Sequence, residues 1–229
     1  MQWGGAHSGY LVEDPGRLLV DCGPGVLSKL RAQEDGWPPL DALLISHWHL
    51  DHWGDLVPWV WGLMFGLGRD VTQPEVWVPP GGVDHLRVFG EQFGTPGMFA
   101  STLDLHEYAA HEPFEAAGFE ITAFRVPHYT VPTYAFRVAD GERTLTYSGD
   151  SAPSNELVAA ARDADFFLCE ATLADDDPEN DPRGHLTAAE AVAAFEASGA
   201  RRLLLTHRPD ELPLPDGLER AHEGLVLEL

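Results

Sequence analysis

Three histidines and two aspartates crowd the segment ISHWHLDHWGD, residues 45–55, directly after the apolar run ALLI. A short apolar run is typical of a buried strand, so the polar cluster begins where that strand ends. In an extended segment residues two apart point the same way, so we expect the side chains of His47, His49 and Asp51 to converge. Imidazole nitrogens and carboxylate oxygens are ligands that zinc and related divalent ions accept. The segment therefore predicts a metal site at the end of a strand.

The neighbours of these three residues complete the predicted geometry. Trp48 and Leu50 point the opposite way and are expected to face the core. His52 is expected to join the ligands from the start of a helix over residues 52–65. A structural zinc site would favour thiolate ligands, which a chain with two cysteines cannot supply in the required number. Nitrogen and oxygen ligands are instead typical of a catalytic metal site with a position open to water.

The whole chain has the size and composition of one domain. Its 229 residues are 44% hydrophobic and no linker or repeat divides them, so we expect a single domain over residues 1–229. No run approaches the ~18–20 apolar residues of a membrane span, and the start has neither a basic segment nor an apolar signal core. The two cysteines, Cys22 and Cys169, are too few for a disulfide framework. These features predict a soluble cytoplasmic protein with no membrane partner.

The charge of the chain is strongly negative, because 37 acidic residues against 14 basic ones give a formal net charge of −23. Proteins that bind nucleic acids neutralise phosphates with basic side chains, and here the basic residues are isolated apart from the pair Arg201 and Arg202. A long nucleic acid is therefore a poor candidate partner. The acidic excess either solvates the surface or is partly offset by bound cations.

Predicted strands and helices alternate along the chain, and several candidate ligands fall where a strand gives way to a loop. Apolar runs predict strands over residues 9–13, 17–23, 41–47, 74–80, 119–128, 133–150, 164–173 and 201–207, with a hairpin turn at Asp140 and Gly141. Helical patterns cover residues 23–33, 52–65, 83–93 and 187–199. The last helix is the best marked, with Thr187 and Glu190 as a capping box and Gly199 at its C-terminal end.

The spacing of the motif HWHLDH, residues 47–52, resembles the signature of the metallo-β-lactamase-fold hydrolases. Three later positions fall in the order that this family uses, and each follows a strand-like run: His128, Asp150 and His207. The resemblance implies an α/β fold, a four-layer αββα sandwich, that carries a metal-dependent hydrolase.

The resemblance also implies a centre with two metal ions, two Zn²⁺ per chain, with manganese and iron as the alternatives. The implied ligands are His47, His49 and His128 for one ion and Asp51, His52 and His207 for the other, with Asp150 as the bridge. Asp51 would also belong to the catalytic residues. A metal pair lowers the pKa of a shared water and stabilises negative charge in the transition state, so hydrolysis is the expected chemistry.

Two motifs between the last ligands resemble the RNase Z-like phosphodiesterase branch of this fold, LCEAT at 168–172 and GHLTAAEA at 184–191. In that branch a glutamate and a histidine work as a pair, so Glu170 would orient His185. His185 would then stabilise the phosphate oxygens or protonate the leaving alkoxide, which departs poorly as a naked anion. The alternative is a structural role for both residues, with Glu170 as a surface carboxylate and His185 as a partner of the acidic loop that precedes His185.

The chain departs from the RNase Z pattern in three places. The opening strand of the fold is scarcely visible before GAHSGYLVE, and position 169 is Cys where many RNase Z relatives carry His. The chain also shows no basic, glycine-rich arm of the kind those nucleases use to grip transfer RNA. Together with the net charge of −23, this favours a small-molecule phosphodiester, such as a cyclic nucleotide or a sugar phosphate ester, over tRNA.

The leading hypothesis is therefore a dinuclear zinc phosphodiesterase. The sequence leaves its oligomeric state open, with a homodimer as the candidate because relatives are often dimers. The alternatives of the same fold are a lactonase or other carbon-ester hydrolase, an RNase Z-type tRNA 3′-processing endonuclease, a diiron redox module and a metal-binding scaffold without turnover. Asp150 counts against a β-lactamase, because those enzymes generally lack a bridging carboxylate there. Diiron modules usually carry Glu where this chain has His49.

Two further segments are expected to have a structural role and to bind no ligand. Trp59, Trp61, Met64 and Phe65 have helical spacing and are expected to form a stripe that packs in the core. The acidic segment 174–184 lacks the ordered ligands of a calcium loop, so we expect it to be solvated.

Overall fold

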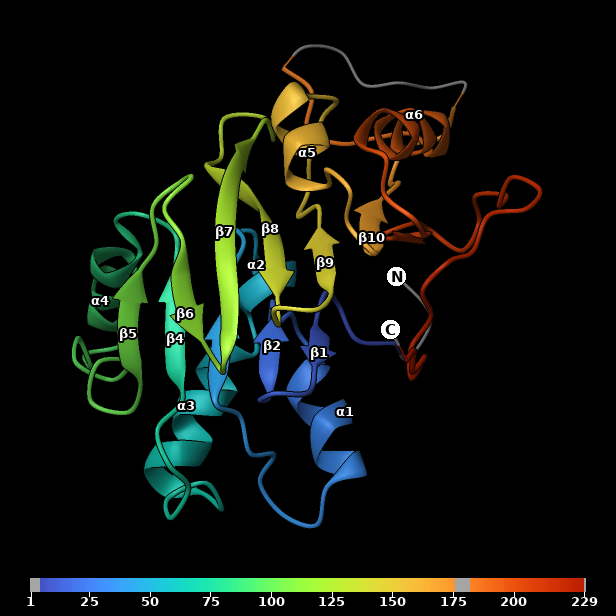
Figure 1. Ribbon diagram of the computed structural model, residues 1–229. Coiled ribbons are helices and arrows are strands. Elements are labelled where there is room, and N and C mark those ends of the chain that lie inside the picture. Colours follow the sequence, from blue (N-terminus) through green and yellow to red (C-terminus); the bar gives the residue numbers. More distant parts are fainter. Residues whose placement is uncertain (1–4, 176–181, 229) are drawn as a thin grey trace. The chain divides into compact units, whose positions relative to one another are not determined.

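The computed structural model describes residues 5–175 and 182–228, and the chain divides into two compact units (Figure 1). The N-terminal unit consists of Ala6–Ala109 and Ala116–Gly118, and the rest of the described residues form the C-terminal unit. Each unit is built around one sheet. The expected single domain over residues 1–229 stays a prediction.

The N-terminal unit has a five-stranded sheet in the order β1-β2-β3-β4-β5. Its strands are β1 (Tyr10–Val12), β2 (Leu18–Val20), β3 (Ala42–Leu44), β4 (Glu75–Val78) and β5 (Asp104–Glu107). β1 pairs antiparallel with β2, whereas β2, β3, β4 and β5 run parallel. Parallel strands end at the same edge of a sheet, so the segments that follow β2 and β3 emerge side by side.

Four helices pack against one face of this sheet, and their buried side chains form one apolar cluster with those of the strands. They are α1 (Val26–Gln33), α2 (Leu50–Trp53), α3 (Leu56–Phe65) and α4 (Gly82–Glu91). Leu19, Leu43 and Val76 are neighbours in register on three adjacent strands, so their side chains share a face. They pack in one cluster with Leu27 of α1 and Trp59 of α3.

The C-terminal unit contains a six-stranded sheet in the order β11-β10-β9-β8-β7-β6. Its strands are β6 (Phe114–Ala116), β7 (Phe119–Val126), β8 (Thr133–Ala139), β9 (Thr144–Tyr147), β10 (Phe166–Glu170) and β11 (Leu203–Thr206). β8 pairs antiparallel with both β7 and β9, and β9, β10 and β11 are parallel. β7, β9, β10 and β11 therefore run in one direction, and their carboxyl ends lie along one edge of the sheet.

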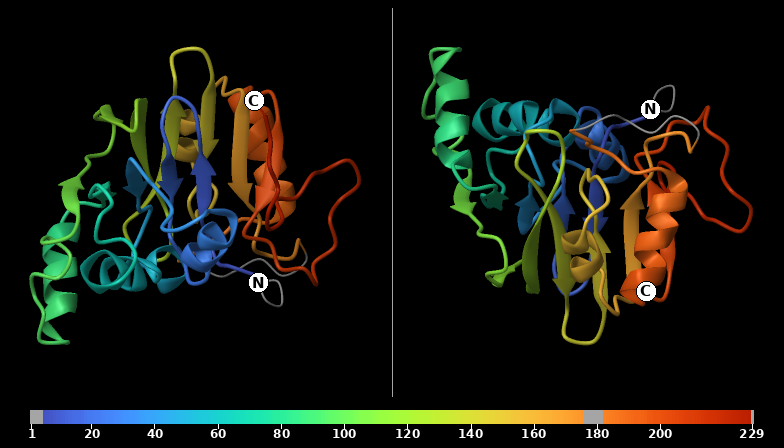
Figure 2. Two further views of the ribbon diagram at one scale, coloured as in Figure 1. Left: turned by 90° about the horizontal axis from the view of Figure 1, so that it is seen from below. Right: turned by 90° about the horizontal axis from the view of Figure 1, so that it is seen from above.

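Two helices pack side by side against the C-terminal sheet, α5 (Asn155–Ala160) and α6 (Ala188–Ser198), as Figure 2 shows. The small side chains of Ala191 and Ala194 join the same buried cluster as Phe167 of β10. The predicted capping box of α6 is present, with reciprocal hydrogen bonds between Thr187 and Glu190. The helix ends, as predicted, at Gly199, whose φ of 73° lies in the left-handed region that glycine adopts at little cost.

The structure corrects three expectations for residues 48–65. Leu50 does not face the core: it is the first residue of α2, the extended alternation ends there, and its side chain is 63% exposed. The helix expected over residues 52–65 is divided into α2 and α3. Trp59 is buried, but Trp61 and Phe65 are exposed and stack on each other, because they lie on the opposite side of α3.

Other expectations for the chain are confirmed or fall outside the described residues. Trp48 and Met64 pack, partly buried, against the apolar cluster of the N-terminal unit. Sequence patterns missed the short elements β5, β6 and α5. The acidic segment 174–184 lies mostly at 176–181, outside the described residues, as does the very start of the chain at 1–4. Within the described ranges, every helix is too short or too polar to span a bilayer.

Candidate metal centre

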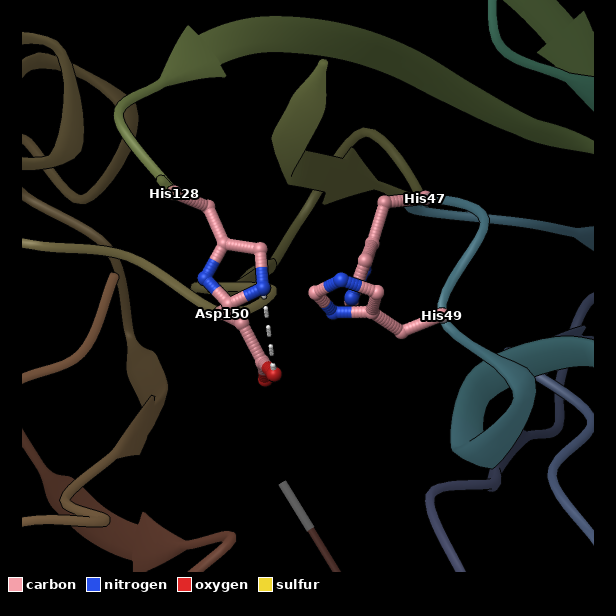
Figure 3. A group of neighbouring side chains, drawn as sticks. All are labelled: His47, His49, His128 and Asp150. Carbon is pink, nitrogen blue, oxygen red and sulfur yellow. Dashed lines mark ion pairs between the residues drawn. The ribbon is translucent and has the colours of Figure 1, made fainter. Parts of the chain in front are cut away.

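The N-terminal unit carries the first four predicted ligands in one short stretch. His47 lies in the loop after β3, and His49 directly precedes α2, which contains Asp51 and His52. The side chains of His47 and His52 are fully buried, and their ring centroids are 4.2 Å apart. The ring of His49 lies edge-on to that of His47 at 4.9 Å, and both are drawn in Figure 3. The sequence therefore places these side chains together locally, by a strand end followed at once by a helix.

Asp21 holds two of these imidazoles. It directly follows β2 and is fully buried, and its Oδ1 and Oδ2 accept hydrogen bonds from the backbone N–H and the hydroxyl of Ser46 at 2.8 and 2.9 Å. Oδ2 also lies 2.7 Å from Nδ1 of His52. The Ser46 hydroxyl in turn lies 3.0 Å from Nδ1 of His47. Since the hydroxyl donates to the carboxylate, it accepts from His47, and Asp21 orients both rings.

The C-terminal unit carries the other ligands at the ends of its codirectional strands. His128 follows β7, Asp150 follows β9 and His207 follows β11. Asp150 Oδ2 lies 3.9 Å from Nε2 of His128, the pair marked by the dashed line in Figure 3, and 3.8 Å from Nε2 of His207. These separations are too long for hydrogen bonds. They suit atoms that bind one cation at bond lengths of about 2.0–2.2 Å.

Glu170 and His185 form a hydrogen-bonded pair beside these ligands. Glu170 is the last residue of β10 and is fully buried, and its Oε1 lies 3.0 Å from Nδ1 of His185. Three further donors hold the carboxylate: the backbone N–H of Ser151 on Oε1, and the backbone N–H and hydroxyl of Thr172 on Oε2. The ring of His185 stacks almost parallel to that of His207, with centroids 5.7 Å apart. Asp150, His185 and His207 each offer one ligand atom, all within 4.8 Å.

The loop that carries His185 is fixed at both sides. Arg183 donates two hydrogen bonds of 2.8 Å to the carboxylate of Glu190 at the start of α6. The backbone carbonyl of Gly184 lies 2.6 Å from Nδ1 of His128. A Cβ atom at position 184 would lie 2.3 Å from the ring of Tyr129, so this close approach requires glycine. The same loop thus orients a predicted ligand and the predicted general acid.

The two cysteines lie outside the predicted set of ligands. Both thiols are buried and form no disulfide, as expected. Burial raises the pKa of Cys22, and the carboxylates of Asp55 and Asp21 raise it further. Burial likewise raises the pKa of Cys169, with Glu170 adding to the effect. A thiol that stays protonated is neither a metal ligand nor a nucleophile.

The chemistry of the donor set fits a divalent metal ion. Four imidazoles have Nδ1 against an oxygen atom: His47 on Ser46, His52 on Asp21, His128 on Gly184 and His207 on Thr172. This arrangement keeps the proton on Nδ1 and makes Nε2 the unprotonated nitrogen. Neutral imidazoles oriented in this way, together with carboxylates, are the donors that zinc and related ions bind in catalytic sites.

The structure thus shows where each predicted site residue lies within its own unit. The N-terminal unit carries His47, His49, Asp51 and His52, and the C-terminal unit carries His128, Asp150, Glu170, His185 and His207. The individual roles of these nine residues stay predictions. Sequence reasoning missed Asp21, Ser46 and Thr172. Asp21 had a signal, since it is a polar residue directly after an apolar strand, whereas Ser46 and Thr172 are ordinary residue types that only the structure connects to a ligand.

Comparisons with known proteins agree with this architecture. A sequence model of the β-lactamase superfamily domain matches residues 16–208. A probable metallo-hydrolase, YhfI of Bacillus subtilis (strain 168), is 32% identical in an alignment of 211 positions that covers 89% of this chain and 80% of YhfI. A ribonuclease Z of Bradyrhizobium sp. is 28% identical over 260 residues, covering 90% of this chain and 85% of that enzyme.

A solved structure supports the same conclusion. The crystal structure of the metallo-β-lactamase-fold protein YhfI from Bacillus subtilis matches with a TM-score of 0.81 and 27% identity, over 97% of this chain and 92% of YhfI. The predicted fold, with two sheets flanked by helices, is therefore confirmed. The predicted resemblance to metallo-β-lactamase-fold hydrolases, with RNase Z-like proteins among the relatives, is confirmed as well.

Proposed function

Because the chain belongs to the β-lactamase superfamily, whose relatives here are metal-dependent hydrolases, we propose that it is a dinuclear zinc phosphodiesterase that acts on a small phosphodiester. A cyclic nucleotide or a sugar phosphate ester is the proposed class of substrate. The observation that carries the proposal is the hydrogen bond between the fully buried Glu170 and the partly buried His185, in the same unit as Asp150 and His207. A carbon-ester hydrolase with a metal centre has no need of this additional acid pair.

The proposed centre keeps the ligand set that the family resemblance implies. Its ligands are His47, His49 and His128 for one ion, Asp51, His52 and His207 for the other, and Asp150 as the bridge. The orientation of the imidazoles by Asp21, Ser46 and Gly184 supports this assignment, because each of these groups keeps a proton on Nδ1. Zinc suits neutral imidazoles with carboxylates, and manganese and iron are the alternatives.

The metal ions and the side chains have different proposed roles in the reaction. The two ions would supply an activated water and stabilise the charge that develops on the attacked phosphate. Glu170 accepts a hydrogen bond from Nδ1–H of His185 and fixes its ring. Nε2 of His185 is therefore the atom that would carry a proton and donate it to the leaving alkoxide. Asp51, at the start of α2, is proposed as a ligand that also helps to position the attacking water.

The charge of the molecule supports a small substrate. The net charge of −23 repels a long polyanion, and at least six of the 14 basic side chains form ion pairs within the described part of the chain. Ion pairs with acidic side chains occupy Arg17, Arg87, Arg183, Arg201, Arg202 and Arg220. We therefore propose a small phosphodiester rather than the tRNA precursor expected of an RNase Z-type enzyme. A cytoplasmic location and a homodimer remain predictions from the sequence.

A substrate panel tests the proposal. The purified full-length protein is loaded with Zn²⁺ and assayed on bis(p-nitrophenyl) phosphate, cyclic nucleotides, a set of lactones and a precursor tRNA. We expect turnover of the small phosphodiesters. Turnover confined to lactones would replace the proposal with a lactonase, and cleavage confined to the tRNA would make the protein an RNase Z-type nuclease.

A matched control identifies which activity belongs to this site. The His185→Ala variant should lose phosphodiesterase turnover, whereas His222→Ala, which removes an exposed imidazole, should keep it. Equal loss in both variants, or in neither, would contradict the proposed role of the Glu170 and His185 pair.

A further inference from the structure

The hydroxyl of Thr172 lies between a proposed metal ligand and the proposed acid pair. Its Oγ1 is 2.9 Å from Nδ1 of His207 and 2.8 Å from Oε2 of Glu170. We propose that Thr172 is a positioning residue that couples His207 to the same carboxylate that holds His185. This inference rests on the proposed function, because it concerns the ligand role of His207.

The polarity of the hydrogen bonds supports the coupling. The carboxylate of Glu170 can only accept, so the Thr172 hydroxyl donates to Oε2. Oγ1 of Thr172 in turn accepts a hydrogen bond from Nδ1–H of His207, which leaves Nε2 of His207 as the proposed ligand nitrogen. The other acceptor near the hydroxyl is the backbone carbonyl of His207 at 3.0 Å, a longer contact to a neutral group. Charged acceptors form the stronger bond, so the donor direction toward Glu170 prevails.

The backbone on both sides holds this hydroxyl in place. The backbone N–H of Ala171 donates to the carbonyl of Thr206 at 3.0 Å, which continues the parallel ladder between β10 and β11 beyond its last pair. The guanidinium of Arg208, itself buried, donates to the carbonyls of Ala171 and Leu173 at 2.8 and 3.2 Å. The segments that carry Thr172 and His207 are thereby tied together on both sides of the hydroxyl.

The two oxygens of Glu170 therefore serve two different imidazoles. Oε1 receives His185 directly, and Oε2 receives His207 through Thr172. Loss of the hydroxyl would leave Nδ1 of His207 facing an apolar side chain and would remove one donor from Oε2. Loss of such an outer partner of a ligating imidazole typically lowers metal affinity or activity about 10–100-fold.

Three variants separate this role from that of an ordinary buried threonine. Thr172→Val removes the hydroxyl at nearly constant shape, and Thr172→Ser restores it. Thr146→Val is the matched control: Thr146 lies on β9, and its buried hydroxyl donates to the carbonyl of Ala160 at 2.9 Å. Zn²⁺ affinity of the metal-free full-length proteins is measured by competition with a chromophoric chelator. The kcat and KM for bis(p-nitrophenyl) phosphate are then measured on the zinc-loaded proteins.

We expect Thr172→Val to bind one of its Zn²⁺ ions about 10-fold or more weakly. Its kcat should fall, while its KM should stay unchanged. Thr172→Ser and Thr146→Val should match the unmodified protein in both measurements. The inference is overturned if Thr172→Val binds zinc like the unmodified protein, or if Thr172→Ser is impaired as much as Thr172→Val. If Thr172→Val does not fold, Thr172→Ala is compared with Thr172→Ser in the same zinc competition, and equal affinities would overturn the inference.

The unmodified protein distinguishes failure of this inference from failure of the proposed function. If it binds two Zn²⁺ and cleaves the phosphodiester while Thr172→Val is unchanged, only the role of Thr172 is wrong. If the unmodified protein binds no zinc, the proposed function itself fails.

Discussion

Oε1 of Glu170 lies 3.0 Å from Nδ1 of His185, and the carboxylate is fully buried. The same oxygen accepts the backbone N–H of Ser151, so the carboxylate cannot rotate without breaking several bonds at once. A histidine held in this way has one defined tautomer and one defined ring orientation. This geometry supports the proposal that the pair presents Nε2 of His185 to a substrate.

Replacement of His185 tests that role. We expect His185→Ala to retain its metal and to lose about 10²–10⁴-fold in kcat on bis(p-nitrophenyl) phosphate, because a general acid typically contributes that much. Metal content is measured by elemental analysis and kcat by steady-state kinetics. A variant that keeps full turnover would show that His185 is not the acid, and loss of metal would show that it is a ligand.

Replacement of Asp21 tests the orientation of the N-terminal ligands. Asp21→Asn keeps the shape but puts an N–H₂ group where Ser46 and His52 need an acceptor. We expect Zn²⁺ affinity to fall about 10–100-fold, measured on the metal-free protein with a competing chelator. Asp41→Asn, which alters an exposed carboxylate in the same unit, is the control. Unchanged affinity in Asp21→Asn would contradict the positioning role.

Protonation of Glu190 should make part of the stability depend on pH. Hydrogen bonds from Arg183 lower the pKa of Glu190 below its usual value of 4.5. Between the lowered value and 4.5 the unfolded chain binds more protons, so the free energy of unfolding falls as the pH falls. Glu190→Gln removes this contribution, so the variant should unfold at a lower temperature than the unmodified protein well above pH 4.5. The difference between the two thermal midpoints should shrink as the pH falls below 4.5. A deficit independent of pH would contradict this account.

The start of α1 depends on a distant carboxylate. The residue that precedes the helix is Gly25, which has no side chain, and Oδ2 of Asp55 accepts the N–H of Leu27 at 2.8 Å in its place. Asp55→Ala should lower the free energy of unfolding by about 0.5–2 kcal/mol, the usual cost of losing a helix cap. Chemical denaturation of the metal-free protein measures it. An unchanged midpoint would show that solvent caps the helix equally well.

The sequence predicted the strand ends that carry the proposed ligands, because polar candidate ligands follow strand-like runs there. Strand-like runs precede His47, Asp150 and His207, so each of these polar residues is predicted to lie in the segment that follows a strand. The parallel direction of β9, β10 and β11 then lines up Asp150, Glu170 and His207 at one edge of the sheet.

Other features could not be predicted because they depend on contacts between distant segments. The sequence around Ser46 gives no sign that its hydroxyl connects Asp21 to His47, since the parallel pairing of β2 and β3 brings these distant segments together. The extended alternation that predicts a core position for Leu50 ends at the first turn of α2, so Leu50 is exposed. Helical spacing alone does not show which side of α3 faces the core, and Trp61 and Phe65 lie on the exposed side.

The metal-to-protein ratio of Asp150→Ala, set against that of the unmodified chain, tests the central claim most directly. Asp150 lies within 3.9 Å of Nε2 of both His128 and His207, so its loss removes the proposed bridge. We expect elemental analysis to find about two zinc ions per unmodified chain, the usual content of a two-metal hydrolase, and fewer in Asp150→Ala. A full metal content in Asp150→Ala would contradict the bridged dinuclear centre.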